Sequence, residues 1–323
     1  MSQQKVAYDA LSAHLTLHQD SILEIEILPP AFSPADNTFL HEGTHLGLTK
    51  PFLILAFLEA RTQFFSALKD ADLLSAVSHL PSKQNTYSCV QTAFSATRPL
   101  LLLDPEHLTA ANFRKRYLKA LQSTSTSDFE TALRRDLLFT TSILTSPLHR
   151  QSKSPTLWYH RHFLLTAFPC DSLRSVLLSE LDVVSKSGER HPKNYYAWQY
   201  ARRLFGRFVM ISEEDFSVLY ECVEKVREWC VQHPGDISGW MFLAWMLRGR
   251  PPAAMEIVKG VILSAIRFQQ ANEALWVFVR TVLADGTVDT ADFLEMLHGY
   301  QGDSPFGEQV AQAIAWVNQN TNA

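Results

Sequence analysis

Several features that mark common classes of protein are scarce in this sequence or missing from it. The four cysteines among 323 residues never show Cys-x-x-Cys spacing, and no Asn-x-Ser/Thr sequon occurs. Nothing therefore predicts a disulfide framework or a secreted glycoprotein. No phosphate-binding glycine loop, dinucleotide fingerprint or nucleophile elbow is present either. We expect a cytoplasmic chain that lacks the usual nucleotide-binding and serine-hydrolase motifs.

Long apolar runs and export signals are also missing. The longest apolar run, Phe52 to Leu58, is too short to cross a bilayer. The first residues have no apolar core of a signal peptide, and the last four carry no lipidation box. We expect a protein that is neither exported nor inserted in a membrane.

The chain has no excess of charge of one sign, because 29 Lys and Arg stand against 33 Asp and Glu. Binding to nucleic acid through a basic surface is therefore not indicated. The average conceals an asymmetry, since residues 104–207 carry 16 basic and 9 acidic side chains while the rest of the chain is acidic. We expect an anionic ligand to be attracted to this middle third.

Apolar residues recur at three- and four-residue intervals through most of the chain after Thr49, a pattern typical of amphipathic helices. Before that point only Ile22–Leu28 alternates as a strand does, and a turn-rich stretch follows it. We expect an N-terminal segment over residues 1–50 and a helical domain over residues 51–323. The expected helices are Pro51–Asp70, His107–Leu121, Phe129–Thr145, Leu157–Phe168, Ser172–Lys186, Tyr195–Arg207, Glu213–Gln232, Ser238–Arg248, Pro252–Gln269, Asn272–Leu283, Thr290–Tyr300 and Glu308–Asn318.

Similar strings recur within the helical domain. When these strings are aligned on their tryptophan, the aligned residues are Ala111, Trp158, Trp198, Trp240 and Trp276. Consecutive members are 47, 40, 42 and 36 residues apart. Such a period accommodates two helices and two turns, so we expect an all-α solenoid of stacked helical hairpins. The repeats cover about residues 101–280, and capping helices extend to residue 323. Each tryptophan is predicted to be a core wedge between hairpins.

The repeated strings are specific enough to indicate a family. They include Lys193-Asn-Tyr-Tyr-Ala-Trp198, Ser154-Pro-Thr-Leu-Trp-Tyr-His-Arg161 and Asp236-Ile-Ser-Gly-Trp240. This pattern resembles the repeats of protein prenyltransferase α subunits, over about Leu101 to Arg280. The segment before the repeats resembles the α-subunit repeat-containing branch, whose α-like chain pairs with a Rab-type β subunit in the third geranylgeranyltransferase.

The resemblance implies a right-handed, TPR-like superhelix and a division of labour between two subunits. In that family the β subunit holds the zinc ion, the prenyl pocket and the acceptor cysteine, and the α subunit embraces it. The implied function is to help transfer a geranylgeranyl or farnesyl group from prenyl diphosphate to a C-terminal cysteine of an acceptor protein. We therefore expect a β-subunit partner, and no metal or cofactor bound by this chain.

The resemblance also suggests site residues. The family places a lysine just before Asn-Tyr against the diphosphate, with a tyrosine two residues later, and the matching positions are Lys193 and Tyr195. Arg202 is a further candidate for diphosphate binding. The plainer interpretation of Lys193 is a solvated lysine at a helix start, where its charge opposes the helix dipole. For Arg161 and His160 we expect a polar pair that bonds across a hairpin interface.

The sequence departs from the family pattern in ways that keep a second hypothesis open. The family pattern has His-Arg directly after Trp-Gln, whereas here Arg202 lies one position later, about 100° further around a helix. Tyr196 stands where the family has a histidine, and Ala111 stands where it has a tryptophan. The alternative is a non-catalytic helical-repeat scaffold that binds a partner protein.

One motif points to different chemistry. His41-Glu-Gly-Thr-His45 matches the HExxH pattern of zinc proteases. Gly43 lies inside it, Gly47 and Pro51 follow closely, and the residues of the extended pattern are missing. We expect no metal site at this motif.

Overall fold

The computed structural model describes residues 1–32, 39–70, 84–166, 173–209, 216–248 and 251–321. The expected helix boundaries at Phe168, Ser172 and Glu213, and also Cys170, lie outside the described residues. The chain divides into two compact units. The first comprises Met1–Asp171 with Glu189–His191, and the second comprises Ser172–Gly188 with Pro192–Ala323.

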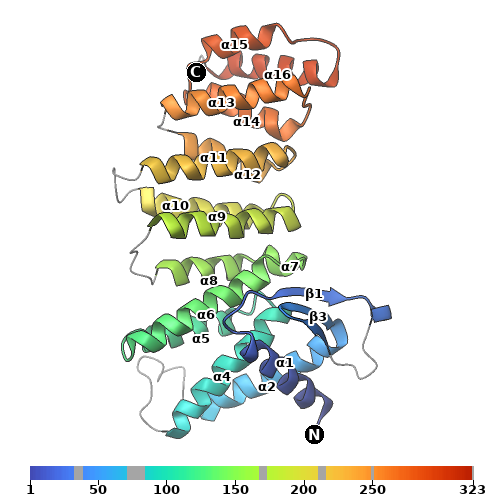
Figure 1. The fold of residues 1–323 in the computed structure, drawn as a ribbon, viewed down its shortest axis with the longest axis vertical. Coiled ribbons are helices and arrows are strands. Elements are labelled where there is room, and N and C mark those ends of the chain that lie inside the picture. The colour runs from blue at the N-terminus through green and yellow to red at the C-terminus, as the bar shows by residue number, and fades with distance from the viewer. Residues whose placement is uncertain (33–38, 71–83, 167–172, 210–215, 249–250, 322–323) are drawn as a thin grey trace. The chain divides into compact units, whose positions relative to one another are not determined.

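The N-terminal part of the first unit consists of three helices in contact with one another. Helix α2 (Lys50–Asp70) packs against α1 (Gln3–Leu17) and α4 (Gln84–Leu103), and α1 also contacts α4 (Figure 1). The sequence pattern did not predict α1 or α4. Helix α4 starts with a polar run and contains Pro99, a residue that ordinarily interrupts a helix.

The remaining helices of the first unit continue the packing. Helix α5 (Leu108–Gln122) contacts α4, α6 (Thr126–Leu144) and α8 (Pro155–Thr166), while the four-residue α7 (His149–Ser152) contacts α6. His107 caps α5 through its Nδ1, and Ser125 caps α6 through its hydroxyl. The predicted helices at these positions are present within a few residues.

A small three-stranded sheet belongs to the first unit. Strand β3 (His45–Thr49) lies between β1 (Glu24–Leu28), which is parallel to it, and β2 (Leu40–Glu42), which is antiparallel, and a 3-10 turn covers Pro30–Phe32. The expectation of a single strand was wrong. The alternating pattern did not predict β2 because that strand has only three residues. It did not predict β3 because Gly47 interrupts the alternation. Glycine is required there, since a Cβ at Gly47 would lie 2.8 Å from the Leu28 side chain.

The second unit is a stack of helices in which consecutive hairpins contact one another (Figure 1). Helix α12 contacts α10, α11, α13 and α14, and α14 contacts α16, so each hairpin packs on the next. The prediction of an all-α helical-repeat solenoid is confirmed. The elements are α9 (Leu173–Arg190), α10 (Tyr195–Val209), α11 (Phe216–Gln232), α12 (Ile237–Leu247), α13 (Pro251–Arg267), α14 (Glu273–Ala284), α15 (Ala291–His298) and α16 (Pro305–Asn320).

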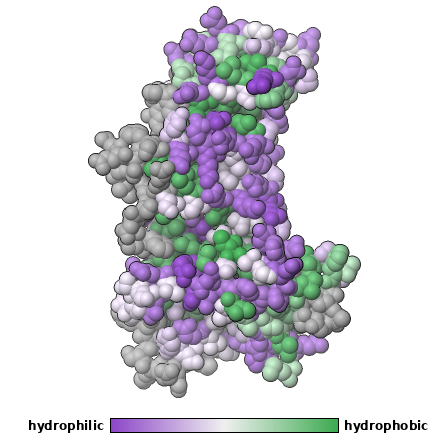
Figure 2. Space-filling view, in the orientation of Figure 1, coloured by the Kyte–Doolittle hydropathy of each residue, from purple (hydrophilic) through white to green (hydrophobic). Residues whose placement is uncertain are grey.

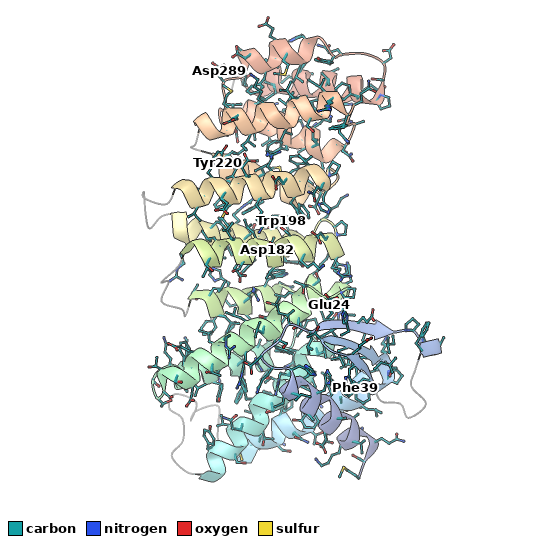
Figure 3. All side chains as sticks on the ribbon, viewed as in Figure 1. Glu24, Phe39, Asp182, Trp198, Tyr220 and Asp289 are labelled. Carbon is teal, nitrogen blue, oxygen red and sulfur yellow. The ribbon has the colours of Figure 1, made fainter. Side chains whose placement is uncertain are left out.

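The repeated tryptophans lie in the core of their units. Trp158, Trp198, Trp240 and Trp276 are each at most 3% exposed. Three of them donate from the indole Nε1 to the carbonyl oxygen six residues earlier, in the segment that precedes the helix, at 2.7 to 3.0 Å. The exception is Trp198 (Figure 3), whose buried Nε1 has no acceptor among the described residues. The loop before α10 therefore differs from its three counterparts.

Helix α2 is apolar along much of its length. Among the described residues it is the one helix long and apolar enough to cross a membrane by length and composition, over Lys50–Lys69. Core helices of soluble proteins meet the same criterion. Phe52, Ala56, Ala60 and Phe64 are buried at four-residue steps, as expected for a helix that packs against neighbours on one side.

Candidate diphosphate site

The loop between α9 and α10 carries Lys193 and is fixed at both sides. Asn194 is fully buried and caps α10, because its Oδ1 accepts from the Ala197 amide at 3.4 Å. Its Nδ2 donates to the Ser187 hydroxyl on α9 at 2.9 Å. The residue after Lys193 thus ties the start of α10 to the preceding helix.

Lys193 has an unusual backbone conformation. Its φ of 58° lies in the left-handed region, which costs a non-glycine residue about 1–2 kcal/mol. The Lys193 amide donates to Asp236 Oδ2 at 2.5 Å, across to the loop of the next repeat. Strained residues persist only where their surroundings hold them, and Asp236 is the group that holds this one.

Asp236 has a double role. It is 2% exposed, and its Oδ1 accepts from the amides of Ser238 and Gly239 at 2.9 and 3.0 Å. One carboxylate therefore caps α12 and binds the backbone of Lys193 in the previous repeat. The sequence motif could not reveal this bond, because the two residues are 43 positions apart.

Three side chains at this loop, those of Lys193, Tyr195 and Tyr196, are exposed to solvent. Lys193 is exposed, Tyr195 is 61% exposed, and the neighbouring ring of Tyr196 lies 5.6 Å from that of Tyr195 in an edge-to-face arrangement. The ammonium group and the phenol are both hydrogen-bond donors. The loop thus presents donors to solvent from a backbone that is tied down on two sides.

Arg202 lies two turns after Tyr195 along α10, which places the two residues near the same face. Burial lowers the pKa of the Arg202 guanidinium, the Tyr195 side chain opposes that shift, and Arg248 adds to it. Arg202 Nη2 donates to the Met241 carbonyl at 3.0 Å, and Nε is buried without an acceptor among the described residues. Arg202 therefore links α10 to α12 and retains donor capacity.

Together these residues form a row of donors along the start and one face of α10. The exposed Arg203 and Arg207 on the same helix add positive charge. Such a row could meet negative charge on a diphosphate, since ammonium, phenol and guanidinium groups all donate to anionic oxygens. The structure brings Tyr195 and Arg202 together and leaves Lys193 at the exposed end.

The other predicted polar residues lie in the core of the first unit. Arg161 Nη1 donates to the Leu137 carbonyl at 3.1 Å and to the hydroxyls of Thr140 and Thr141 at 3.1 and 2.9 Å, all on α6. His160 Nε2 lies 3.0 Å from Asp136 Oδ2. This pair therefore joins α8 to α6.

The centre of that buried network carries no signal in the sequence pattern. Arg114 lies 2.7 Å from Asp136, and both are at most 3% exposed. Burial alone would raise the pKa of Asp136, but Arg114 and His160 hold it well below its usual range. Burial lowers the pKa of His160 in spite of the carboxylate. Arg114 is therefore a basic side chain of the middle third that is paired inside the protein and is not offered to a ligand.

The HExxH pentapeptide forms a hairpin. His41 lies on β2 and His45 on β3, and Gly43 in the turn has a φ of 56°. A zinc protease needs both histidines one turn apart on a helix, and that helix does not form. No group of three His, Cys, Asp or Glu suited to a metal ion occurs among the described residues.

Comparisons with known proteins found distant relatives of this chain. A family model described as the ECM9 middle domain matches residues 157–259. The chain is 26% identical over 246 residues to Protein ECM9 of Saccharomyces cerevisiae, covering 74% of this chain and 58% of that protein. It is 25% identical over 171 residues to Protein prenyltransferase alpha subunit repeat-containing protein 1 of Danio rerio, covering 47% of this chain and 37% of that protein.

A third relative is the Geranylgeranyl transferase type-2 subunit alpha of Saccharomyces cerevisiae. It is 23% identical over 222 residues, which cover 64% of this chain and 63% of that protein. The chain thus spans less than two thirds of the length of each of these relatives. The comparisons confirm the resemblance to prenyltransferase α subunits at the level of distant relatives. The residues that match the ECM9 middle domain include the loop that carries Lys193.

Proposed function

From this kinship we propose that the chain is the α-type subunit of a heterodimeric protein prenyltransferase. Its role is to help transfer a geranylgeranyl or farnesyl group from prenyl diphosphate to a C-terminal cysteine of an acceptor protein. The observation that supports this proposal most strongly concerns Lys193. Its backbone is strained and its side chain is exposed, and its amide is held by the buried carboxylate of Asp236 in the next repeat. A solvated lysine at a helix start would need no such anchor.

In the proposed chemistry, this chain stabilises the diphosphate leaving group. The acceptor cysteine reacts as a thiolate, after its proton has passed to solvent. The bond between prenyl C1 and the diphosphate oxygen breaks, a bond between C1 and the thiolate sulfur forms, and the diphosphate leaves with the electron pair. Negative charge accumulates on the departing oxygens. The Lys193 ammonium and the Tyr195 hydroxyl would donate to them, and Arg202 would add positive charge nearby. Donors placed beforehand lower the barrier because they need not reorganise during the reaction.

The heterodimer requires a partner that supplies the other components. The zinc ion, the prenyl pocket and the binding site of the acceptor cysteine would all lie in the β subunit, and we place the complex in the cytoplasm. The second unit exposes apolar and aromatic side chains that a partner could cover, among them Tyr220, Leu263 and Phe268 at 43%, 48% and 62%. On the face drawn in Figure 2, apolar patches lie among the hydrophilic surface of this unit.

One observation favours a non-catalytic scaffold as a second function. Arg202 is already bound to the Met241 carbonyl, so part of its donor capacity serves the packing of α10 on α12. In that case the chain would keep the helical repeats and the β-subunit interface but contribute nothing to transfer.

The test is co-expression of this chain with each prenyltransferase β subunit of the same genome, followed by size exclusion and a labelled prenyl-transfer assay. The α-subunit role predicts a stable one-to-one complex that labels an acceptor protein. A complex that labels no acceptor from a panel of C-terminal cysteine proteins would favour the scaffold. Failure to form a complex with any β subunit would contradict both the heterodimer and the catalytic role.

A further inference from the structure

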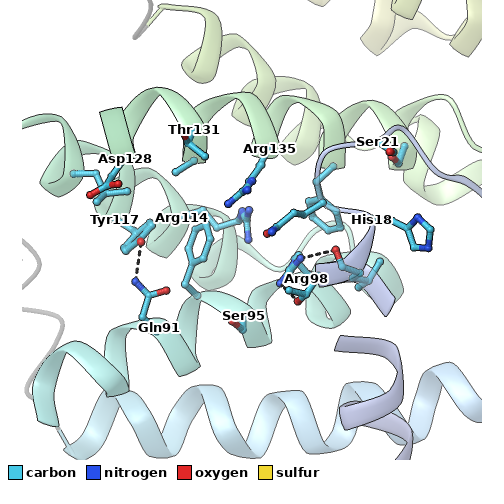
Figure 4. Close-up of a pocket in the computed structure, with 18 of the residues that line it drawn as sticks. His18, Ser21, Gln91, Ser95, Arg98, Arg114, Tyr117, Asp128, Thr131 and Arg135 are labelled. Atoms are coloured by element: carbon cyan, nitrogen blue, oxygen red, sulfur yellow. Dashed lines mark hydrogen bonds between the residues drawn. The ribbon is translucent and has the colours of Figure 1, made fainter. Parts of the chain in front are cut away.

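The first unit contains a cavity that the proposed transferase role does not use. It has a volume of about 420 Å³, within the range of small-molecule sites. Residues from α1, α4, α5 and α6 and the segment after α1 line it. Figure 4 shows Arg98, Arg114 and Arg135 directed from three helices toward its middle.

The three arginines differ in how their charge is balanced. Arg114 is paired with Asp136 at 2.7 Å, and Arg135 is paired with Asp20 at 3.1 Å. Asp128 is the one carboxylate among the described residues that line the cavity, and it lies at the end beside Tyr117 (Figure 4).

Arg98 has only neutral partners. Its Nη1 donates to the Leu15 carbonyl at 2.8 Å and its Nη2 to the Thr16 hydroxyl at 2.9 Å, while the buried Nε has no acceptor among the described residues. Burial and then the charge of Arg114 lower the pKa of Arg98 to about 10. Asp136 offsets these effects only in part and is already paired with Arg114, so an anion in the cavity would stabilise the partly buried Arg98 cation.

The cavity also offers an apolar wall beside the cations. Phe94 and Tyr117 lie with ring centroids 4.2 Å apart and ring planes tilted by 34°, and Phe139 and Leu121 line the same space. Gln91 donates to the Tyr117 hydroxyl at 2.9 Å and thereby fixes that ring. A ligand could therefore place a charged group near the arginines and an apolar group against the aromatic rings.

We propose that this cavity binds a small organic phosphate. Arg98 and the remaining donors of Arg135 receive the phosphate oxygens, and the Phe94 and Tyr117 rings receive the organic part. Arginine suits this role because its guanidinium carries five N–H donors, of which the bonds described use two in Arg98 and two in Arg135. The inference does not depend on the proposed prenyltransferase role.

The test is calorimetric titration of the full chain with phenyl phosphate at low ionic strength, with phenol and benzoate as reference probes. We expect phenyl phosphate to bind more tightly than either. Arg98→Gln should weaken its binding about tenfold or more, since hydrogen bonds to charged groups are among the strongest. Arg116→Gln is the matched control, because Arg116 is exposed on α5 and does not line the cavity, and it should leave binding unchanged.

A second variant keeps the proposal testable if Arg98→Gln does not fold. Ala132→Phe fills the cavity from α6 without removing a charge, and it should abolish binding of phenyl phosphate. The proposal is overturned if phenyl phosphate binds no better than phenol or benzoate. It is also overturned if Arg116→Gln weakens binding as much as Arg98→Gln, or if Ala132→Phe has no effect.

Discussion

Replacing Asp236 should destabilise the second unit and impair the proposed transfer at the same time. In Asp236→Ala, α12 loses its cap, which typically costs about 1 kcal/mol. The Lys193 amide also loses a charged acceptor at 2.5 Å, and leaving such a donor unpaired costs about 1–3 kcal/mol. We expect a total near 2–4 kcal/mol, or a fall of about 5–15 °C in the melting temperature.

The assay is thermal and urea unfolding of the full chain, with Asp289→Ala as the matched control. Asp289 is an exposed aspartate that accepts from the Ala291 amide at the start of α15 (Figure 3). Its replacement should cost no more than about 1 kcal/mol. Equal losses for the two variants would refute the claim that the bond between repeats stabilises the Lys193 loop.

Asp236→Asn separates the two roles of the carboxylate. The amide oxygen can still cap α12, while the amide NH₂ group offers no acceptor to the Lys193 backbone. Stability should fall less than in Asp236→Ala, yet prenyl transfer by the reconstituted heterodimer should fall with it because Lys193 is released. Transfer at the wild-type rate would show that Asp236 does not position Lys193.

Three further predictions follow from the same structure. Trp240→Phe should destabilise the chain by about 1 kcal/mol more than Trp198→Phe in urea unfolding, because only Trp240 has a paired indole N–H; equal losses would contradict this. Lys193→Gly should raise the free energy of unfolding by up to about 1 kcal/mol, since glycine adopts the φ of 58° without strain. The rate of prenyl transfer should fall in the same variant. A lower free energy of unfolding would contradict the claim that the Lys193 backbone is strained. Burial and two neighbouring histidines lower the pKa of His14 to about 4, so its folded form resists protonation and stability falls as the pH drops from about 6.5 to about 4. Melting temperatures across that range should depend less on pH in His14→Gln than in the wild type. The same pH dependence in both proteins would refute the claim that His14 causes the loss of stability.

The repeat architecture could be predicted because its signal is local and recurs. Tryptophans about 40 residues apart, each close behind a turn, indicate one wedge per hairpin. The helices around Trp158, Trp240 and Trp276 accordingly begin within a few residues of the predicted positions.

The elements and contacts that the sequence did not predict have identifiable physical causes. Helix α4 tolerates Pro99 because tertiary packing against α2 outweighs local propensity. Strand β3 carries a glycine where the Leu28 side chain leaves no room for a Cβ. The Asp236 bond to Lys193 and the Arg114 pair with Asp136 join residues 43 and 22 positions apart, and a periodic pattern holds no information on such contacts.

The most direct test of the central claim is the single-turnover rate of prenyl transfer by the heterodimer that carries Lys193→Ala. The account predicts a large loss of rate with complex formation intact, partial recovery in Lys193→Arg, and no loss in Lys186→Ala, which removes an exposed lysine from α9. Transfer by Lys193→Ala at the rate of Lys186→Ala would contradict the catalytic role of Lys193 and favour the scaffold.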